Sequence, residues 1–143
     1  MDDAPAPDGM DFPSWTAAKV RASEESLERR NREMRLTVAM NAGGEIAAFT
    51  ELRVSRGSTL GFTDDTGTVA AHRGKGLARA VKVESLRRLR TEHPEVIVVT
   101  TSNAEENAVM RHLNESIGFR PSVVETLAAV DLGRSARTSG NPR

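Results

Sequence analysis

The sequence predicts a mixed α/β domain, and three observations support this fold class. Apolar residues recur at helical spacing in some segments and alternate or run together at strand spacing in others, in the order α-β-β-β-α-β-α-β. Turn-forming runs rich in glycine, proline or asparagine separate several of these segments. The length of 143 residues and the hydrophobic content of 38% suit one domain with one core.

Local signals place the individual elements. Thr16 is a plausible N-cap for the first helix, and Asn41-Ala42-Gly43-Gly44 is a hairpin turn. Val96-Ile97-Val98-Val99 is a continuous β-branched run, typical of a strand buried on both faces. Gly118 is positioned to end the last helix. The predicted elements are a helix over 17–34, strands over 36–40, 45–54 and 60–71, a helix over 76–92, a strand over 96–99, a helix over 105–117 and a strand over 123–132.

Composition limits the function classes. Twenty basic and twenty acidic residues cancel, so no global field attracts nucleic acid or an anionic membrane, and no apolar run is long enough to span a bilayer. The chain has no cysteine, which excludes disulfides and thiolate metal sites and fits a cytoplasmic protein. We expect a flexible acidic arm over 1–13, a folded unit over 14–133 and a disordered basic tail over 134–143.

A glycine-containing loop stands between the third strand and the second helix. Its sequence is Arg73-Gly74-Lys75-Gly76-Leu77-Ala78. Backbone N–H groups at a helix N-terminus bind anions, and two glycines let the backbone approach one closely. The phosphate-binding P-loop and the dinucleotide fingerprint do not fit, because their further glycines and Lys-Ser/Thr pair are absent. On the loop alone, an ordinary turn with solvated basic side chains is an equal alternative.

The loop resembles the signature Gln/Arg-x-x-Gly-x-Gly/Ala of the GNAT superfamily of N-acetyltransferases. A second segment is similar at the expected distance, where the family shows Asn, an apolar residue, Tyr and Gly-Phe, and this chain has Asn107, Met110, Asn114 and Gly118-Phe119. The wider pattern looks like the catalytic lobe of bacterial tandem-GNAT proteins; it comprises Phe49-Thr50-Glu51-Leu52, Asp65-Thr66, His72-Arg73-Gly74 and Asn103-Ala104-Glu105-Glu106-Asn107. The resemblance implies a mostly antiparallel, twisted sheet flanked by helices.

The resemblance further implies acetyl-CoA as co-substrate and acetyl transfer to a primary amine of a small molecule or peptide. The residues implied to bind the cofactor are Thr68, Val69, Arg73, Gly74, Lys75, Gly76, Leu77, Ala78 and Asn107. A backbone N–H near Val69 would polarise the thioester carbonyl. The strands on either side of Val69 and Val99 would splay to admit the pantetheine arm.

Three residues are candidates for the chemistry. Glu51 and Asp65 are candidate bases for the amine, although a strand carboxylate is commonly solvated or paired with an arginine. Asn114 stands where the family has its Tyr acid, and the chain contains no tyrosine. Asn114 could donate a hydrogen bond to the thiolate or serve as a structural bridge. No cluster has convincing metal-ligand spacing, so we expect no metal.

The family's first strand is missing from the predicted elements. The chain would then be one lobe of a tandem protein, a truncated product, or a subunit that borrows an edge from a second lobe or a homodimer partner. A non-catalytic, acyl-CoA-binding lobe is the alternative function. A nucleic-acid site formed by Lys82, Arg87, Arg88 and Arg90 is a third interpretation, disfavoured because these residues form no stripe.

Overall fold

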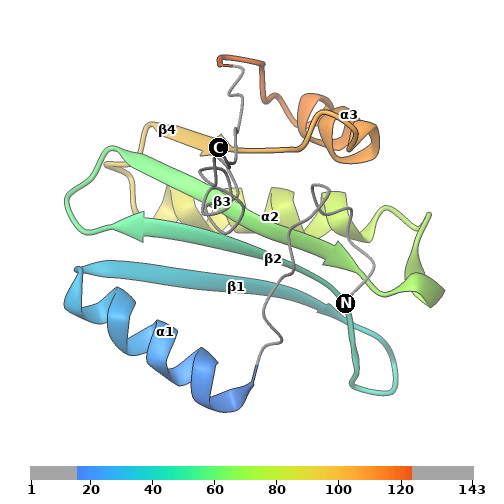
Figure 1. The fold of residues 1–143 in the computed structure, drawn as a ribbon. Helices are drawn as coiled ribbons and strands as arrows, with labels where there is room; N and C mark the ends of the chain where they lie inside the picture. The colour runs from blue at the N-terminus through green and yellow to red at the C-terminus, as the bar shows by residue number, and fades with distance from the viewer. Residues whose placement is uncertain (1–15, 124–143) are drawn as a thin grey trace, which may run out of the picture.

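The computed structural model describes residues 16–123, which form a four-stranded sheet with helices around it (Figure 1). The predicted arm, the basic tail and the strand predicted over 123–132 lie wholly or almost wholly outside this range. The elements, in order, are α1 (Ala17–Arg29), β1 (Arg32–Met40), β2 (Ile46–Ser55), β3 (Leu60–Thr68), the 3-10 helix η1 (Ala70–His72), α2 (Leu77–Glu92), β4 (Val98–Thr101) and α3 (Ala108–Ser116).

The sheet is mixed and mostly antiparallel, as the sequence predicted. Its order is β1-β2-β3-β4, in which β1 with β2 and β2 with β3 are antiparallel and β3 with β4 is parallel. The hairpin between β1 and β2 turns where it was predicted, since Asn41 Oδ1 accepts hydrogen bonds from the N–H groups of Gly43 and Glu45. A parallel neighbour requires a crossover, and α2 provides it between β3 and β4.

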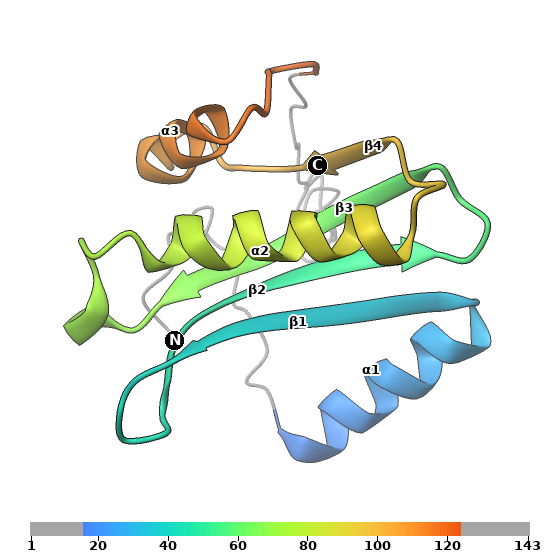
Figure 2. The ribbon, with the colours of Figure 1, turned by 180° about the vertical axis from the view of Figure 1, so that it is seen from behind.

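Helix α2 covers one face of the sheet, as seen from behind in Figure 2. Its Leu89 forms the core cluster with Leu52 and Val54 of β2. Leu86 of α2 and Val99 of β4 pack against this cluster from the side. The core therefore lies between α2 and the middle of the sheet, which fixes the direction in which α2 and its N-terminal loop point.

Strands β3 and β4 stay together over only four residue pairs, from Leu60 with Val98 to Thr63 with Thr101. Beyond Thr63, β3 continues to Thr68 beside β2, whereas the chain after Thr101 leaves toward α3. Figure 1 shows the two segments diverging. This leaves the β4-facing edge of β3 without a strand partner in the described part of the chain, on the side where α2 begins.

Helix α1 lies outside the sheet, next to β1 (Figures 1 and 2). Thr16 caps it as predicted, by accepting a hydrogen bond from Lys19 N–H, but none of its residues is buried. Within residues 16–123, β1 pairs only with β2, so its outer edge carries no strand. The first strand of the expected fold is thus absent from the described range.

Several predicted boundaries were wrong. The first helix ends at Arg29 and not near Met34, because Asn31 takes a positive φ of 57° and β1 starts at once. The third strand ends at Thr68, where η1 follows, and the last helix starts only after its N-cap Asn107.

The prediction of a strand at 96–99 buried on both faces was also wrong. The strand spans Val98–Thr101, Ile97 is 77% exposed and Val98 is 45% exposed. Val96 and Val99 pack against the core under α2. Side chains alternate along β4, so Val98 points away from the face on which Val99 packs, and Ile97 precedes the strand.

Candidate acyl-CoA site

The loop before α2 has the backbone geometry of an anion cradle. Gly74 and Gly76 have φ values of 72° and 73°, and Gly76 is the N-cap of α2 in a left-handed conformation. The first helical hydrogen bond runs from Ala80 N–H to Gly76 C=O. The amides at the start of α2, including those of Leu77 and Ala78, therefore have no intrahelical acceptor and lie at the positive end of the helix dipole.

Space is also open at this loop. A Cβ atom built on Gly74 or Gly76 meets no atom within 4 Å, so the space beside each of these glycines is open. The basic side chains bond back to the preceding segment: Arg73 Nε donates to Thr68 C=O at 3.2 Å, and Lys75 Nζ donates to Ala71 C=O at 3.4 Å. Both charges are thus held against the segment that precedes the loop.

The open edge of β3 leads from the cradle into the sheet. Val69 N–H donates to Ala47 C=O at 2.9 Å, so this N–H points toward β2 and cannot face a ligand between β3 and β4. Peptide groups alternate in direction along a strand, so the N–H and C=O of Thr68 face the opposite, open edge. The bond from Arg73 to Thr68 C=O agrees with this direction. The donor available beside Val69 is therefore the N–H of Thr68.

The two predicted asparagines lie at opposite ends of α3. Asn107 caps the helix, with its Oδ1 accepting from Met110 N–H at 3.1 Å. Asn114 is only 3% exposed, and its Nδ2 donates to Asn103 Oδ1 at 3.3 Å. The Asn114 Oδ1 is buried without a hydrogen-bond partner among the described residues. Asn114 thus bridges α3 to the segment after β4, and it has one acceptor left over.

The candidate bases meet at an irregularity of the sheet. In β2, Glu51 alone separates Thr50 from Leu52, whereas their β3 partners, Thr66 and Thr63, are separated by two residues, Asp64 and Asp65. This extra residue in β3 is a β-bulge, a feature common next to active sites. The bulge lies at Asp64 and Asp65.

The electrostatics of the bulge differ between its carboxylates. Burial raises the pKa of Glu51 above its ordinary value, with further increases from Asp65 and Asp64 and a smaller opposing effect of Arg53. Asp64 forms an ion pair with Arg53, whose guanidinium also stacks over the Phe62 ring at 5.3 Å. Asp64 is therefore paired, Asp65 is exposed to solvent, and Glu51 is the half-buried carboxylate best placed to take up a proton.

Sequence reasoning missed one unusual residue. Lys82 was considered only for the disfavoured nucleic-acid site, but its side chain in α2 is only 2% exposed. Its Nζ lies 5.5 Å from the centre of the Phe119 ring, and burial lowers its pKa to about 8. The only sequence signal was its position among the apolar residues of α2, between Val81 and Leu86. With Lys82 buried, the nucleic-acid interpretation loses one of its four residues.

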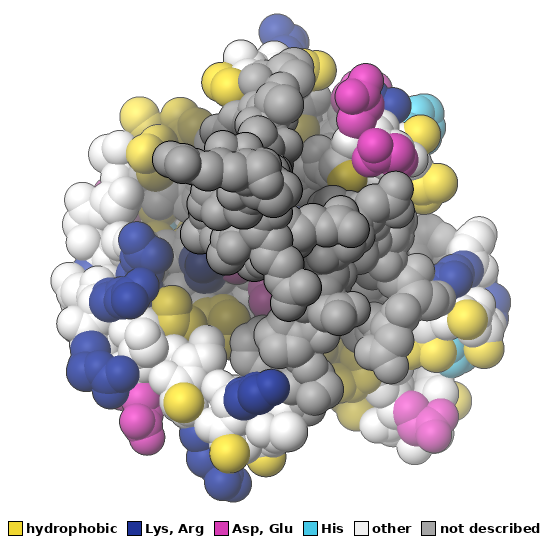
Figure 3. All heavy atoms as spheres, viewed as in Figure 1, with side chains coloured by type: hydrophobic (Ala, Val, Ile, Leu, Met, Phe, Trp, Pro, Cys, Tyr) yellow, Lys and Arg dark blue, Asp and Glu magenta, His cyan; other side chains and the backbone are white. Residues whose placement is uncertain are grey.

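The basic side chains visible in Figure 3 form separate groups and no continuous stripe among the described residues of this face. No helix in residues 16–123 is both long and apolar enough to cross a bilayer. The same residues contain no group of three His, Asp or Glu side chains that could hold a metal ion.

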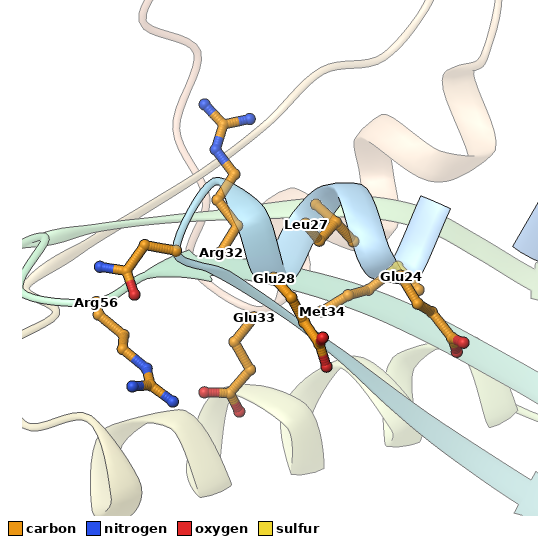
Figure 4. A pocket seen from close by; sticks show the side chains of 8 residues that line it. Glu24, Leu27, Glu28, Arg32, Glu33, Met34 and Arg56 are labelled. Atoms are coloured by element: carbon orange, nitrogen blue, oxygen red, sulfur yellow. The ribbon is translucent and has the colours of Figure 1, made fainter. Parts of the chain in front are cut away.

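A separate cavity of about 600 Å³ lies between α1 and the start of β1 (Figure 4). Leu27 and Met34 supply its apolar part, and the remaining lining residues are charged or polar: Glu24, Glu28, Asn31, Arg32, Glu33 and Arg56. It contains neither the cradle nor the bulge. The candidate site is instead the open edge of β3 between these two features.

Comparison with known proteins gives structural relatives only. No family model and no curated protein matches the chain by sequence. Among solved structures, a tandem GNAT protein from the clavulanic acid biosynthesis pathway is similar with a TM-score of 0.69 and 30% identity over 73% of this chain. That match covers 33% of the tandem protein, so this chain spans about a third of the relative's length.

Two further structures share the fold at lower identity. The enzyme AAC(6')-Iy, in complex with the bisubstrate analogue CoA-S-monomethyl-acetylneamine, has a TM-score of 0.63 and 14% identity, with 84% of each chain covered. Glucosamine-6-phosphate N-acetyltransferase from Arabidopsis thaliana has a TM-score of 0.59 and 19% identity, with 85% of this chain and 83% of that one covered.

Proposed function

Because this chain belongs to the GNAT superfamily, we propose that it is an N-acetyltransferase that moves an acetyl group from acetyl-CoA to a primary amine. The observation that carries the proposal is the continuity of cradle and open strand edge. Free amides at the start of α2 suit the pyrophosphate, and the edge of β3 from Asp64 to Thr68, which has no strand partner among the described residues, suits the amides of the pantetheine arm.

The residues at the cradle would divide the binding between them. The amides after Gly76 would hold the pyrophosphate, with Arg73 and Lys75 adding positive charge. Thr68 N–H would donate to the pantetheine arm or the thioester carbonyl, and Val69 would line the entrance with its exposed side chain. Asn107 would keep Nδ2 for the ligand while its Oδ1 caps α3.

Glu51 would act as the general base, directly or through a water molecule. Amine attack needs a neutral nitrogen, and the raised pKa of Glu51 makes this carboxylate a better proton acceptor than an ordinary one. Asp65, across the bulge, would keep that pKa high and could hold the protonated amine near the site. Attack on the thioester carbon would form the N–C bond, and the C–S bond would break with release of the coenzyme A thiol.

The alternative is a non-catalytic, acyl-CoA-binding lobe of a larger acetyltransferase. Three facts favour it: no tyrosine stands at position 114, β1 has an open outer edge within residues 16–123, and the chain spans about a third of a tandem GNAT protein. A second lobe or a second copy could pair with that edge. Both proposals require acetyl-CoA to bind at the cradle.

Calorimetry with acetyl-CoA, followed by a thiol-release assay with a panel of amines, tests the proposal. We expect micromolar binding and released thiol with at least one amine. Binding without thiol release on a broad panel would favour the lobe, and no binding at millimolar acetyl-CoA would refute both functions. The panel should include aminoglycosides, amino sugars, polyamines and peptide N-termini.

A matched pair of glycine variants tests the cradle itself. Gly76 and Gly57 both have a φ of 73° and open space around the Cβ position, but Gly57 lies in the turn between β2 and β3. Valine at either position meets the same backbone strain, roughly 1–2 kcal/mol. We expect Gly76→Val to weaken acetyl-CoA binding at least about tenfold and Gly57→Val to leave it unchanged. Equal affinities would show that the loop is an ordinary turn.

A further inference from the structure

Lys82 is an ammonium group enclosed by the protein without a counter-charge. Its side chain is 2% exposed, and no carboxylate or hydrogen-bond acceptor within residues 16–123 contacts it. Lysine is almost never fully buried unless it is paired, because removing the charge from water is costly. The Phe119 ring compensates only part of that cost. An unpaired lysine in such a place has a reason other than stability.

The position of Lys82 along α2 places it where β3 and β4 separate. Leu86 and Val99 both pack against the core cluster. Lys82 lies one helical turn before Leu86, roughly 6 Å back along α2. Helix α2 runs antiparallel to β3 and β4, the two strands that it connects. A step of this length toward the N-terminus of α2 therefore corresponds to about two residues toward the C-terminus of β4, from Val99 to Thr101. Thr101 and Thr63 are the last parallel pair of the sheet.

The contact between Lys82 and Phe119, which follows α3, supports the same placement of Lys82. Phe119 follows α3, and its N–H donates to Asn114 C=O at 3.0 Å. The ring of Phe119 therefore connects Lys82 to the end of α3 at Asn114. In Figure 2, α2 passes in front of the place where β3 and the segment after β4 separate, and α3 follows that segment. Lys82 and Asn114 thus enclose the inner end of the gap from two helices.

Their unused hydrogen-bonding groups are complementary. Lys82 is a donor without an acceptor, and Asn114 Oδ1 is a buried acceptor without a donor. A group that lies between them and can both accept and donate would satisfy both residues. A thiol at the end of a pantetheine arm has this property, because its sulfur accepts from Lys82 and its S–H donates to Asn114 Oδ1. An asparagine cannot deliver a proton, whereas an ammonium can.

We propose that Lys82 donates the proton that the coenzyme A sulfur takes up when the C–S bond breaks, in place of the absent tyrosine acid. The inference depends on the proposed acetyl transfer. As the tetrahedral intermediate collapses, the electron pair of the C–S bond goes to sulfur, and Lys82 Nζ passes one proton to it. The products are the amide, the free thiol and a neutral Lys82 amine, which regains its proton from water. Asn114 positions the sulfur.

The donor and the acceptor of the proposed proton transfer have similar pKa values. Burial lowers the pKa of Lys82 to about 8, close to the roughly 8.5 of an ordinary thiol, so the proton moves with little free-energy change. No charged group contributes to this shift. The other buried polar side chains of residues 16–123 are uncharged: Thr50, Thr63, Ser85 and Asn114. The charged residues on the α2-facing side of β1, Glu33 and Arg35, pair with His93 and Glu92 at the far end of α2.

A binding comparison tests the inference without any acceptor. Coenzyme A and desulfo-coenzyme A differ only in the sulfur, so their affinity ratio at pH 8 reports the interaction at that atom. We expect the wild type to prefer coenzyme A about tenfold, the usual effect of a hydrogen bond to a charged group. Lys82→Met should abolish the preference, and Lys19→Met, which removes an exposed lysine of α1, should retain it.

Kinetics supplies a second readout. Once an acceptor is known, wild-type turnover should fall above pH 8, as Lys82 loses its proton. Lys82→Arg keeps the charge but holds its proton too tightly, so we expect turnover to drop about tenfold to a hundredfold and the decline above pH 8 to disappear. If Lys82→Met does not fold, the wild-type ligand ratio and Lys82→Arg still decide the question.

The role of Lys82 and the acetyl-CoA site can be refuted separately. Equal wild-type affinity for both ligands, or an unchanged pH profile in Lys82→Arg, would overturn the role of Lys82 and leave the acetyl-CoA site intact. Failure of both ligands to bind would overturn the site and this role together.

Discussion

At the scale of single residues, two ionisable side chains occupy environments that oppose their charge. Lys82 is buried without a carboxylate partner among the described residues, and Glu51 is half-buried beside Asp64 and Asp65. Lys82 lies on α2, which covers one face of the sheet, and Glu51 lies on β2 opposite the bulge of β3. Perturbed acid and base groups on either side of an open strand edge are typical of a proton-transfer site.

The stability of the protein should depend on pH through Lys82. Its pKa falls from the ordinary value of 10.5 to about 8 on folding, so the unfolded chain binds more protons between these values. The free energy of unfolding should therefore rise between pH 8 and 10.5, by at most about 3 kcal/mol. Urea titrations across this range should show the rise in the wild type and not in Lys82→Met. A parallel rise in the variant would place its cause elsewhere.

Glu51→Gln should reduce turnover while leaving acetyl-CoA affinity unchanged. The amide cannot accept the proton of the amine, and a general base contributes roughly 10² to 10⁴ in rate. In the wild type, activity should rise with pH through the raised pKa of Glu51 and fall away below it. The control is Glu45→Gln, a carboxylate in the exposed hairpin turn. Full activity in Glu51→Gln would transfer the role to Asp65 or to solvent.

At the scale of elements, the two longer helices have unequal roles. Helix α2 carries four buried residues and covers the core, whereas α1 carries none and borders only β1. The cradle is built on the start of the stable helix, so its amides keep fixed directions. A site on a firmly packed element is held more rigidly than one on a loosely packed one.

Leucine-to-alanine changes in the two helices should separate these roles. Leu89 of α2 is 3% exposed, and Leu89→Ala should lower the free energy of unfolding by about 3 kcal/mol. Leu27 of α1 is only half-buried, so Leu27→Ala should cost less than about 1 kcal/mol. Chemical denaturation measures both. Similar losses would mean that α1 packs more firmly than its exposure indicates.

At the scale of the whole molecule, the gap between β3 and α3 divides the fold into two parts that a ligand could connect. Helix α2 joins β1, β2 and β3 through the core, and α3 reaches this body chiefly through Asn114, Phe119 and Lys82. A molecule that contacts the cradle, the edge of β3 and the end of α3 would link them.

Acetyl-CoA should consequently stabilise the fold and slow hydrogen exchange on both sides of the gap. At 100 times Kd, binding adds about 2.7 kcal/mol, which corresponds to a rise in Tm of roughly 5 to 10 °C. Slower exchange is expected in residues 64–68 and in α3, and unchanged exchange in α1. Gly76→Val should show neither effect. Protection confined to α1 would point to the cavity beside that helix instead.

The cradle and the order of elements could be predicted from the sequence because their determinants are local. Glycines at positions 74 and 76 permit the left-handed backbone whatever the rest of the chain does, and the period of apolar residues identifies α2. The hairpin turn at Asn41 is local in the same sense, since its side chain bonds to Gly43 and Glu45, both within the next four residues.

The remaining features were decided by tertiary structure. The bulge sets Glu51 opposite Asp65 through strand pairing, and the direction of Val69 N–H depends on Ala47, 22 positions earlier in the chain. Lys82 reads as a surface residue until Phe119 covers it. The sequence by itself thus determined where an anion can be held, because backbone dihedrals are a local property. Only the folded chain decided which groups face the open edge and which charge is buried there, because burial depends on residues distant in sequence.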